Sequence, residues 1–279
     1  MSEDGERWRY DGKRVVVTGV ASGIGAHVAQ QVTSLGGEVI GLDLRPPAVQ
    51  IASFIDLDLS SEPSIDHAAA SIGGRVDALF NVAGVSSGIG DPLRVVTINF
   101  LGTRRFTEAI VPAMPPGSAI ANVSSLAASA YRENAPVTAG LLDTATIDEG
   151  VEWCRAHPEA LADGGGYRLA KEAIILYGMA QVCALGARGI RINCTAPGVT
   201  DTPILDQLRA AYGQDFLDAF RTPLGRVSTP DEQAGVLVFL NSAAASYITG
   251  QVIWVDGGII GESDLAGSVP RRTVDSAQG

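Results

Sequence analysis

A tyrosine and a lysine four residues apart, Tyr167 and Lys171, are the side chains of this sequence best suited to proton transfer. They open a long apolar stretch with helical spacing, and residues four apart share one face of a helix. The ammonium of Lys171 can therefore lie beside the phenol of Tyr167, where it is expected to lower the phenol's pKa from its usual value of about 10. A tyrosine tuned in this way accepts or donates a proton near neutral pH. Because such pairs are common on helix surfaces, the meaning of this one depends on its surroundings.

A glycine-rich turn near the N-terminus indicates what those surroundings are. The β-branched run 15–17 suits a buried parallel strand, and residues 26–32 have the spacing of a helix. Between them, Gly19, Gly23 and Gly25 allow a tight turn and a close approach of the backbone to a ligand. Strand, turn and helix together place free N–H groups at one point, which suits a pyrophosphate. A turn without a ligand is the alternative, but the position between strand and helix favours a dinucleotide site.

Asp43 indicates which dinucleotide would bind. It ends a second apolar run, 38–43, and lies 18 residues after Gly25. A carboxylate at this point accepts hydrogen bonds from the adenosine ribose and repels a 2′-phosphate, so the predicted cofactor is NAD and not NADP. Arg45 lies close enough to soften that preference, and a solvated aspartate at a strand end is the alternative interpretation.

The elements that must position these residues alternate along the chain. Further strands are predicted at 51–59, 76–84, 118–125, 190–196 and 251–255, and further helices at 62–72, 92–113, 167–187 and 231–240. This alternation predicts an α/β fold, a single-domain Rossmann-type doubly wound sheet of about seven parallel strands with helices on both faces. The site of such a sheet lies beyond the carboxyl ends of its strands. The segments predicted to end there are the glycine turn, Asp43, Ala83–Gly84, Ser124–Ser125 and Pro197–Gly198.

Two segments depart from the alternation. Residues of about 127–166 form an insert before Tyr167, and its middle, 144–157, can make an amphipathic helix. The polar, proline-punctuated stretch of about 199–230 is predicted to be a mobile lid with one or two short helices. Residues beyond about 262 are polar and predicted to be extended. Since no repeat or linker divides the sequence, residues 1–279 are predicted to form one domain.

Composition excludes several classes of partner. Twenty basic and 31 acidic residues give a net charge of −11, which disfavours nucleic acid and anionic membrane surfaces. Cys154, Cys183 and Cys194 have no metal-type spacing and are predicted to be buried free thiols of a reducing compartment, and the scattered histidines predict no metal site. The acidic N-terminus differs from a signal peptide, and no run approaches the ~18 apolar residues of a membrane span. The protein is therefore expected to be cytoplasmic and soluble.

In this arrangement the chain resembles the short-chain dehydrogenase/reductase family over nearly all of residues 11–261. The motifs that carry the resemblance are Thr18 to Gly25 (TGVASGIG), Asn81-Val-Ala-Gly84, Asn99, Ser124-Ser125, Tyr167-x-x-x-Lys171, Pro197-Gly198 and Thr202. Within the family it is most similar to the bacterial 3α-hydroxysteroid dehydrogenase/carbonyl reductase group, with which it shares the insert, Asp58-Leu59-Ser60 and Ala244-Ala245-Ser246-Tyr247.

The resemblance implies a role for each matching residue. Tyr167 is the general acid/base, Lys171 lowers its pKa and holds the nicotinamide ribose, Ser125 (in preference to Ser124) bonds the substrate oxygen, and Asn99 holds a water in a proton relay. The residues implied to bind NAD are Gly19, Ser22, Gly23, Ile24, Gly25, Asp43, Asp58, Leu59, Asn81, Ala83, Gly84, Tyr167, Lys171, Pro197, Gly198, Val199 and Thr202. A homo-oligomer, either a dimer or a tetramer, is also implied.

The sequence departs from the family's pattern in two places. Val82 stands where an asparagine is frequent, which puts little in doubt. Ser125 precedes Tyr167 by 42 residues, whereas about 13 is usual in the family. The insert responsible for this spacing either caps the substrate cleft or reshapes the surface where family members pair their long helices.

A specific activity follows as a hypothesis: NAD-dependent interconversion of a bulky hydrophobic secondary alcohol, such as a steroid, terpene or aryl alcohol, and its ketone. Apolar residues of the predicted lid favour such a substrate, unless they only pack the lid onto the core; they are Ile204, Leu205, Leu208, Tyr212, Phe216, Leu217 and Phe220. One alternative is a 3-oxoacyl thioester reductase, which would normally use NADP and a basic patch for its acidic carrier. Another is a non-catalytic nicotinamide-binding scaffold or sensor, which has no need of the tyrosine.

Overall fold

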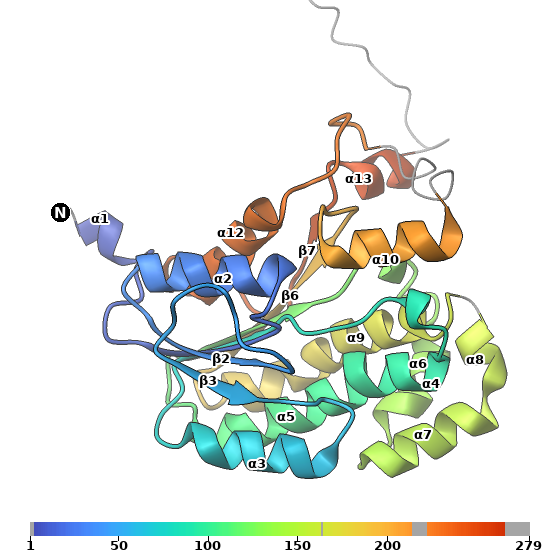
Figure 1. Cartoon of the computed structure of the whole chain (residues 1–279), viewed down its shortest axis with the longest axis horizontal. Coiled ribbons are helices and arrows are strands. Elements are labelled where there is room, and N and C mark those ends of the chain that lie inside the picture. Colours follow the sequence, from blue (N-terminus) through green and yellow to red (C-terminus); the bar gives the residue numbers. More distant parts are fainter. Residues whose placement is uncertain (1–2, 163, 214–221, 266–279) are drawn as a thin grey trace, which may run out of the picture.

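A sheet of seven parallel strands runs through the computed structural model, which describes residues 3–162, 164–213 and 222–265 (Figure 1). The strand order is β3-β2-β1-β4-β5-β6-β7, so the direction in which strands are added reverses beside β1. This confirms the predicted fold class. The strands are β1 Arg14–Thr18, β2 Glu38–Asp43, β3 Ser53–Asp56, β4 Ala78–Asn81, β5 Ala119–Val123, β6 Arg191–Pro197 and β7 Val252–Val255.

Helices cover both faces of the sheet (Figure 1). On one face lie α2 Gly23–Ser34 and α12 Pro230–Asn241; on the other lie α3 Glu62–Ile72, α5 Thr103–Ile110 and α9 Tyr167–Gly186. Successive side chains of a strand point to opposite faces. Val15 and Val17 of β1 accordingly pack in the cluster that includes Val28 of α2, while Val16 packs in the cluster that includes Phe106 of α5. Alternate side chains of one short, apolar strand thus contribute to the core on both faces of the sheet.

The helix predicted over 92–113 is continuous in direction but changes its hydrogen-bond pattern. It begins as α4 Pro92–Val96, where Asp91 caps it, continues as a π-helical segment, Thr97–Gly102, and then becomes α5 and a final 3-10 turn at Val111–Ala113. The π segment passes very close to the chain after β3, since a Cβ placed on Gly102 would lie 1.9 Å from the carbonyl oxygen of Leu59. Local widenings of this kind are frequent at functional sites, and this one carries Asn99.

The insert contains three helices where the sequence predicted one: α6 Ala135–Leu142, α7 Ile147–Ala156 and α8 Pro158–Ala162. The predicted helix is α7, capped by Thr146 as its side chain accepts from the Glu149 amide at 3.1 Å. The helices α6 and α8 pack against α9, and α7 packs on the π segment, where Gly150 approaches the Leu101 side chain. The insert therefore lies beside the helix that carries Tyr167 and Lys171 (Figure 1).

The remaining elements bear out one sequence prediction, a short helix within 199–230, and correct another. The 199–230 segment contains α10 Pro203–Tyr212, whereas Phe216, Leu217 and Phe220 lie outside the described residues. A short helix, α13 Ile259–Asp264, follows β7, so the first residues beyond 262 are helical and not extended as predicted. The other short elements are α1 Glu3–Glu6 and 3-10 turns at Ser87–Ile89, Leu126–Ala128 and Ala243–Ala245.

The cysteines and the longest helix give two further corrections. Cys154 and Cys194 are buried free thiols as predicted, but Cys183 is exposed because it lies on the outer side of α9. The helix α9 reaches the length and mean hydropathy (1.3) of a membrane span, contrary to the prediction that no stretch does, yet 56% of this window is buried inside the protein. Its apolar character is that of a core helix.

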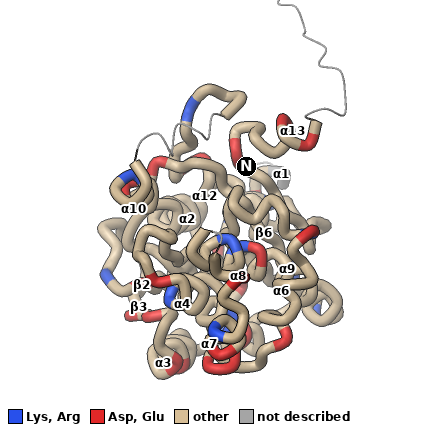
Figure 2. The backbone as a smooth tube through the Cα atoms, turned by 90° about the vertical axis from the view of Figure 1, so that its right-hand side faces the viewer, with Lys and Arg blue, Asp and Glu red and all other residues tan. Residues whose placement is uncertain are grey.

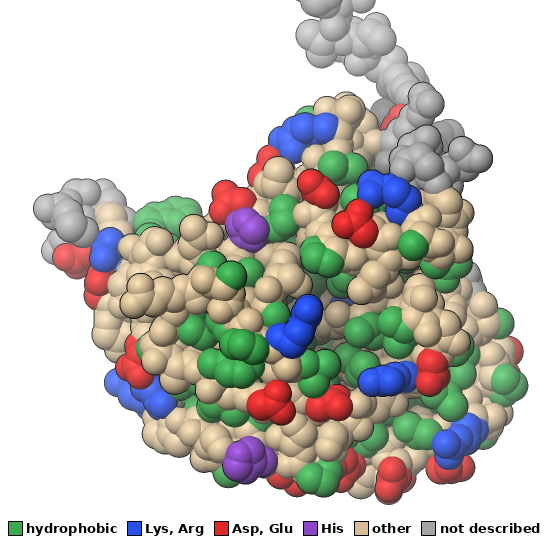
Figure 3. Space-filling view, in the orientation of Figure 1, with side chains coloured by type: hydrophobic (Ala, Val, Ile, Leu, Met, Phe, Trp, Pro, Cys, Tyr) green, Lys and Arg blue, Asp and Glu red, His purple; other side chains and the backbone are tan. Residues whose placement is uncertain are grey.

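Charged side chains of both signs are interspersed over the described surface. Figure 2 shows Asp and Glu near Lys and Arg at α7, α8 and α10, and the face in Figure 3 has no continuous basic area. Ion pairs such as Arg105 with Asp66 and Arg226 with Glu232 account for part of this mixing. A surface of this kind offers no focus for a polyanion.

Candidate active site

Tyr167 is the first residue of α9 and stands at the carboxyl end of the sheet. Gly164, Gly165 and Gly166 before it all have positive φ, and a Cβ on Gly166 would lie 2.5 Å from the carbonyl oxygen of Pro92. Only glycine adopts this backbone without strain, so the run turns the insert sharply into α9. Tyr167 is half-buried, and its side chain is hydrogen-bonded to that of Ser125.

Lys171 lies on the same helix face, with its Nζ atom 5.6 Å from the centroid of the Tyr167 ring, as the four-residue spacing predicts. Its side chain is 5% exposed, and Nζ donates a hydrogen bond of 3.0 Å to the carbonyl oxygen of Val123. Burial lowers the pKa of Lys171 to about 8, against a smaller opposing influence of the Cys194 thiol.

The expected direction of the Tyr167 pKa is wrong for this structure. Burial raises it above the ordinary value, and the hydrogen bond with Ser125 opposes that rise. The physical reason is that the low-dielectric surroundings penalise the phenolate, while the ammonium of Lys171 is directed to the Val123 carbonyl. A sequence shows the spacing of two charges but not the desolvation around them.

The two adjacent serines at the end of β5 have different partners. The Ser124 hydroxyl is buried and donates to the carbonyl oxygen of Lys171 at 2.7 Å, so it fastens α9 to the sheet. The Ser125 side chain is half-buried, contacts Tyr167, and accepts from the Ala127 amide at 3.2 Å. The serine beside the phenol is therefore Ser125, in agreement with the preference stated from the family pattern.

Asn99 projects from the π segment to the same point. Its amide group is paired at both ends with Val85, donating to the carbonyl oxygen and accepting from the N–H, each at 2.8 Å. A Cβ on Gly84 would lie 2.9 Å from Asn99 Oδ1 and 3.6 Å from Lys171 Nζ. Asn99 and Lys171 thus converge behind Gly84. Because the Asn99 side chain is engaged with Val85, its part in a water relay stays a prediction.

The glycine turn has the geometry of a cradle for an anionic cofactor. Gly19 has φ +81°, and a Cβ there would lie 2.9 Å from the Ala83 backbone; a Cβ on Gly25 would lie 2.1 Å from the carbonyl oxygen of Gly19. Ser22 precedes α2 without a side-chain capping bond, which leaves the first N–H groups of the helix available to a ligand. Gly23 and Ile24 follow in the first turn, and a Cβ on Gly23 would lie 3.4 Å from the Thr202 side chain.

Two carboxylates lie at the neighbouring strand ends. Asp43 closes β2, and its Oδ2 accepts from the Ala21 amide in the glycine turn at 3.0 Å. Asp58 follows β3, and its Oδ1 accepts from the amide and hydroxyl of Ser60 at 2.8 and 2.6 Å. Both carboxylates are half-buried. They keep further acceptor positions at the edge where an adenosine would lie.

Other predicted cofactor residues differ in which way their side chains face. Asn81 is 4% exposed and bonds inward to Thr107 and Asn122, both at 2.8 Å, and Leu59 packs in the core, so neither presents its side chain at the edge. After β6, Gly198 passes so close to Asp256 that a Cβ would lie 2.8 Å from its Cα. Val199 binds Ser228 through its carbonyl oxygen, and Thr202 precedes α10.

Sequence reasoning missed several residues around this site. The Ser86 hydroxyl donates to Oε1 of Gln207 at 3.2 Å, and the Tyr212 hydroxyl donates to Ser87 at 3.0 Å, which joins α10 to the turn after β4. Glu172, next to Lys171, is completely buried. Glu172 follows Arg168 by four residues, as Lys171 follows Tyr167, and this spacing could have indicated an ion pair between Arg168 and Glu172.

Metal chemistry has no visible basis at the site. Across the three stretches that the structure describes, no cluster of three or more His, Cys, Asp or Glu side chains could hold a metal ion.

The fold and this constellation of residues define a nicotinamide-dependent oxidoreductase class, and the chain belongs to the short-chain dehydrogenase/reductase family. The profile described as short chain dehydrogenase matches residues 13–138, and that described as enoyl-(acyl carrier protein) reductase matches residues 156–260.

Individual relatives agree with this membership. The chain is 36% identical to a coniferyl-alcohol dehydrogenase from a Pseudomonas species (88% of this chain, 96% of the relative) and 31% identical to a 3-alpha-hydroxysteroid dehydrogenase/carbonyl reductase from Comamonas testosteroni (88% and 95%). Its structure is similar to the 3-alpha-hydroxysteroid dehydrogenase of Pseudomonas sp. B-0831 complexed with NADH, with a TM-score of 0.78 and 29% identity over 92% of this chain and all of that one.

Proposed function

We propose that the protein interconverts a bulky hydrophobic secondary alcohol and its ketone with NAD as hydride carrier. The observation that carries the proposal is the convergence of Ser125, Tyr167 and Lys171 at the carboxyl end of the sheet, beside a cradle for a dinucleotide. A protein that only bound the cofactor would not need a phenol bonded to a serine at this point.

Each of these side chains has a distinct part in alcohol oxidation. Tyr167, as the phenolate, accepts the hydroxyl proton, and Ser125 donates a hydrogen bond to the substrate oxygen as charge develops there. Lys171 supplies positive charge next to the phenol. NAD⁺, held by the glycine turn and Asp43, would supply the acceptor for the hydride that leaves the carbinol carbon. The alcohol thus loses one hydride and one proton, which balances its conversion to a ketone.

NAD is proposed over NADP on the position of Asp43. Its carboxylate closes β2 and is already fixed by the Ala21 amide, so it stands ready to accept from ribose hydroxyls and to repel a 2′-phosphate. The cradle fits a dinucleotide because Gly19 and Gly25 let the turn fold tightly on its own backbone and on Ala83, and because Ser22 leaves the first N–H groups of α2 uncapped. Asp58 is proposed to hold the adenine side of the same site.

The substrate class is proposed from the 199–230 segment, which we infer to act as a lid. In α10, Leu205 is buried, while Ile204 and Leu208 are half-buried. The bonds of α10 to Ser86 and Ser87 place this apolar helix over the turn that follows β4. A hydrophobic alcohol would find apolar surface there and hydrogen-bonding groups for its oxygen at Ser125 and Tyr167.

The test is NAD⁺ reduction, followed by nicotinamide absorbance, over a panel of secondary alcohols that includes a 3α-hydroxysteroid, a 1-arylethanol and a cyclic terpene alcohol, with NADP⁺ in parallel; turnover only on a primary alcohol such as coniferyl alcohol would contradict the ketone assignment. We expect turnover on one class with NAD⁺, and a loss of about 10²-fold or more in Tyr167→Phe with NAD⁺ binding retained. Because the pKa of Tyr167 is raised, only a small fraction of this phenol is ionised near neutral pH, and the rate of alcohol oxidation should therefore increase as the pH rises. Unchanged turnover in Tyr167→Phe would contradict the assignment.

The same assay separates the alternatives. A 3-oxoacyl thioester reductase would turn over an acyl thioester with NADPH, although a chain of net charge −11 is poorly suited to an acidic carrier. A scaffold or sensor would bind NAD⁺ without turnover on any substrate. We further propose a cytoplasmic homo-oligomer, a dimer or tetramer, which light scattering on the purified protein would test; a monomer would contradict it.

A further inference from the structure

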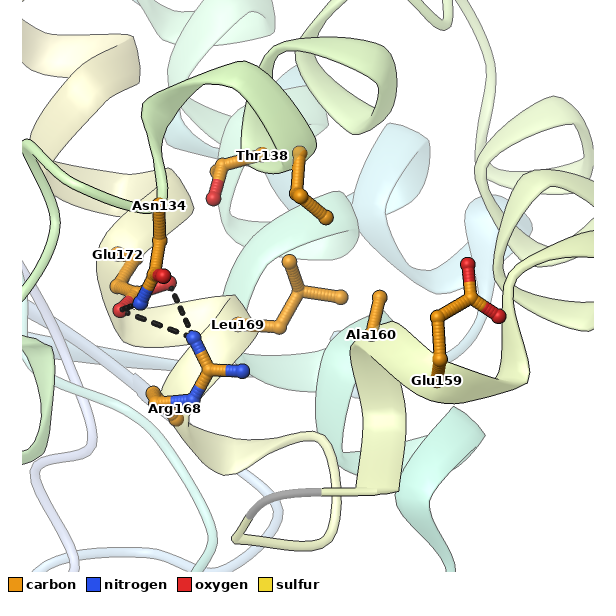
Figure 4. A pocket seen from close by; sticks show the side chains of 8 residues that line it. Asn134, Thr138, Glu159, Ala160, Arg168, Leu169 and Glu172 are labelled. Atoms are coloured by element: carbon orange, nitrogen blue, oxygen red, sulfur yellow. Dashed lines mark hydrogen bonds and ion pairs between the residues drawn. The ribbon is translucent and has the colours of Figure 1, made fainter.

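The insert is fastened to the catalytic helix through a buried carboxylate next to Lys171. Glu172 is fully buried, and its Oε1 accepts from Nδ2 of Asn134 at 2.6 Å (Figure 4). Arg168, one turn earlier on α9, donates to both oxygens at 3.2 and 3.0 Å. Asn134 precedes α6 but does not cap it with its side chain. That side chain is used instead to reach α9.

A continuous series of turns connects Asn134 to Ser125. The Ala128 amide donates to the carbonyl oxygen of Ser125 at 3.0 Å, the Tyr131 amide to that of Ala128 at 3.1 Å, and the Asn134 amide to that of Ala130 at 3.0 Å. The Tyr131 side chain, 2% exposed, anchors the middle of this segment in the core. Residues 125–134 therefore form one hydrogen-bonded segment with a buried anchor at Tyr131. We expect a displacement of Asn134 to move Ser125 as well.

Both ends of the 125–134 segment contact α9. Ser125 contacts Tyr167 at the start of the helix, and Asn134 binds Glu172 five residues later, about 7.5 Å along the helix axis. The Ser125–Tyr167 contact joins two neutral hydroxyl groups. The Asn134–Glu172 contact joins an amide to a buried carboxylate, which would lose one of its hydrogen-bond donors without Asn134. The stronger contact is expected to set the position of the weaker one.

We propose that Glu172 and Asn134 are positioning residues that hold Ser125 in register with Tyr167, so that the insert takes part in assembling the catalytic geometry. The inference deepens the proposed function and rests on it. It gives the insert a role in turnover in addition to covering α9.

The surroundings of Glu172 make the proposal open to mutation. A cavity of about 110 Å³, lined by Thr138, Glu159, Arg168 and Leu169 among others, adjoins the Asn134–Glu172 contact (Figure 4). It has room for water, so the carboxylate can be hydrated once Asn134 is shortened. The protein is therefore expected to fold in the Asn134→Ala variant.

The experiment compares Asn134→Ala, Glu172→Ala and Glu172→Gln with the wild type on the most active alcohol of the panel. We expect kcat to fall about tenfold in the two alanine variants, as for a small misplacement of a catalytic group, with KM and NAD⁺ affinity within about twofold. Glu172→Gln keeps the oxygen that Asn134 needs and should retain kcat within about threefold. The double variant Asn134→Ala/Glu172→Ala should be no worse than either single one.

A second readout does not require turnover. Alkaline titration of the phenolate absorbance, taken as the difference from Tyr167→Phe, reports the pKa of Tyr167 in the protein without substrate. Looser contact with Ser125 should raise that pKa in Asn134→Ala, because this hydrogen bond lowers it in the wild type. The alkaline limb of kcat should move in the same direction.

Thr146→Ala is the matched control. It removes the cap of α7 in the same insert, away from Glu172, and should lower the melting temperature without changing kcat or the Tyr167 titration. Wild-type kcat and titration in Asn134→Ala would overturn the inference, as would an equal loss of kcat in Thr146→Ala. If Tyr167→Phe itself keeps full turnover, it is the proposed function that fails.

Discussion

Lys171 should cost the folded protein stability at neutral pH. Its pKa falls from 10.5 to about 8 on burial, which corresponds to about 3 kcal/mol favouring the unfolded state when the group is charged. The bond from Lys171 Nζ to the Val123 carbonyl compensates about 1 kcal/mol of this penalty. In Lys171→Met, which keeps an unbranched apolar stem, we therefore expect a gain of about 2 kcal/mol in the free energy of unfolding at pH 7.

The pH dependence gives this prediction a sign that can be checked. Below pH 8 the lysine is protonated in both states, and the full penalty applies to the wild type. Between pH 8 and 10.5 the unfolded chain holds a proton that the folded protein has released, so wild-type stability rises with pH. Above 10.5 the lysine is neutral in both states, and Lys171→Met should be less stable by about 1 kcal/mol, the lost hydrogen bond.

Urea unfolding, followed by tryptophan fluorescence at fixed protein concentration and without NAD⁺, measures the difference between variant and wild type from pH 7 to 11. Lys171→Arg serves as the control, because an arginine stays protonated over this range and should abolish the rise of stability between pH 8 and 10.5. A Lys171→Met variant that is less stable at pH 7, or whose difference from the wild type is the same at every pH, would refute the reasoning.

Three further substitutions test other parts of the structure. Asp43→Asn keeps an acceptor for the Ala21 amide but removes the charge; KM for NAD⁺ should rise about fivefold and that for NADP⁺ should fall, whereas an unchanged ratio would count against Asp43 as the selector. Asp77→Asn weakens the contact of a buried carboxyl with the exposed guanidinium of Arg75; burial raises the pKa of Asp77, but the hydrogen bonds from Arg75 and the Arg14 amide lower it by more, so the variant should lose about 1 kcal/mol at pH 7, and the difference should vanish as the pH falls through that lowered pKa, unlike a purely steric defect. Gly102→Ala forces a Cβ to within 1.9 Å of the Leu59 carbonyl and should cost about 3 kcal/mol in thermal unfolding, while Gly186→Ala, with open space around it, should be neutral or stabilising; equal effects would contradict the packing argument.

Local patterns were sufficient for the sheet and its principal helices. The bounds of β2, Glu38–Asp43, and of α3, Glu62–Ile72, agree with the prediction because an apolar run defines the first and the Ser61 cap begins the second. The convergence of site residues was also predictable, since parallel strands end at one edge. The choice of Ser125 over Ser124 came from the family pattern and is explained by their different partners in the structure.

What could not be predicted depends on the environment of a residue and not on its neighbours in sequence. The helix α6 buries only Thr138 and Leu141, so its sequence has no clear apolar stripe. The raised pKa of Tyr167 follows from desolvation that no spacing reveals. In the sequence, Glu172 has the spacing of a surface i,i+4 ion pair with Arg168. The carboxylate is buried because the insert packs against α9.

The strand order also bears on how the chain is made. Each strand after β1 pairs with a strand that precedes it in the sequence: β2 with β1, β3 with β2, β4 with β1, and then β5, β6 and β7 each with the one before. A chain emerging from the ribosome can therefore add every strand to an edge that already exists. The glycine turn and Asp43, carried by β1 and β2 and packed beside β4, are translated before Tyr167, whereas Pro197, Gly198 and Thr202 follow it. The adenosine side of the proposed cofactor site is thus laid down first, and the nicotinamide side and the catalytic tyrosine are added to it later.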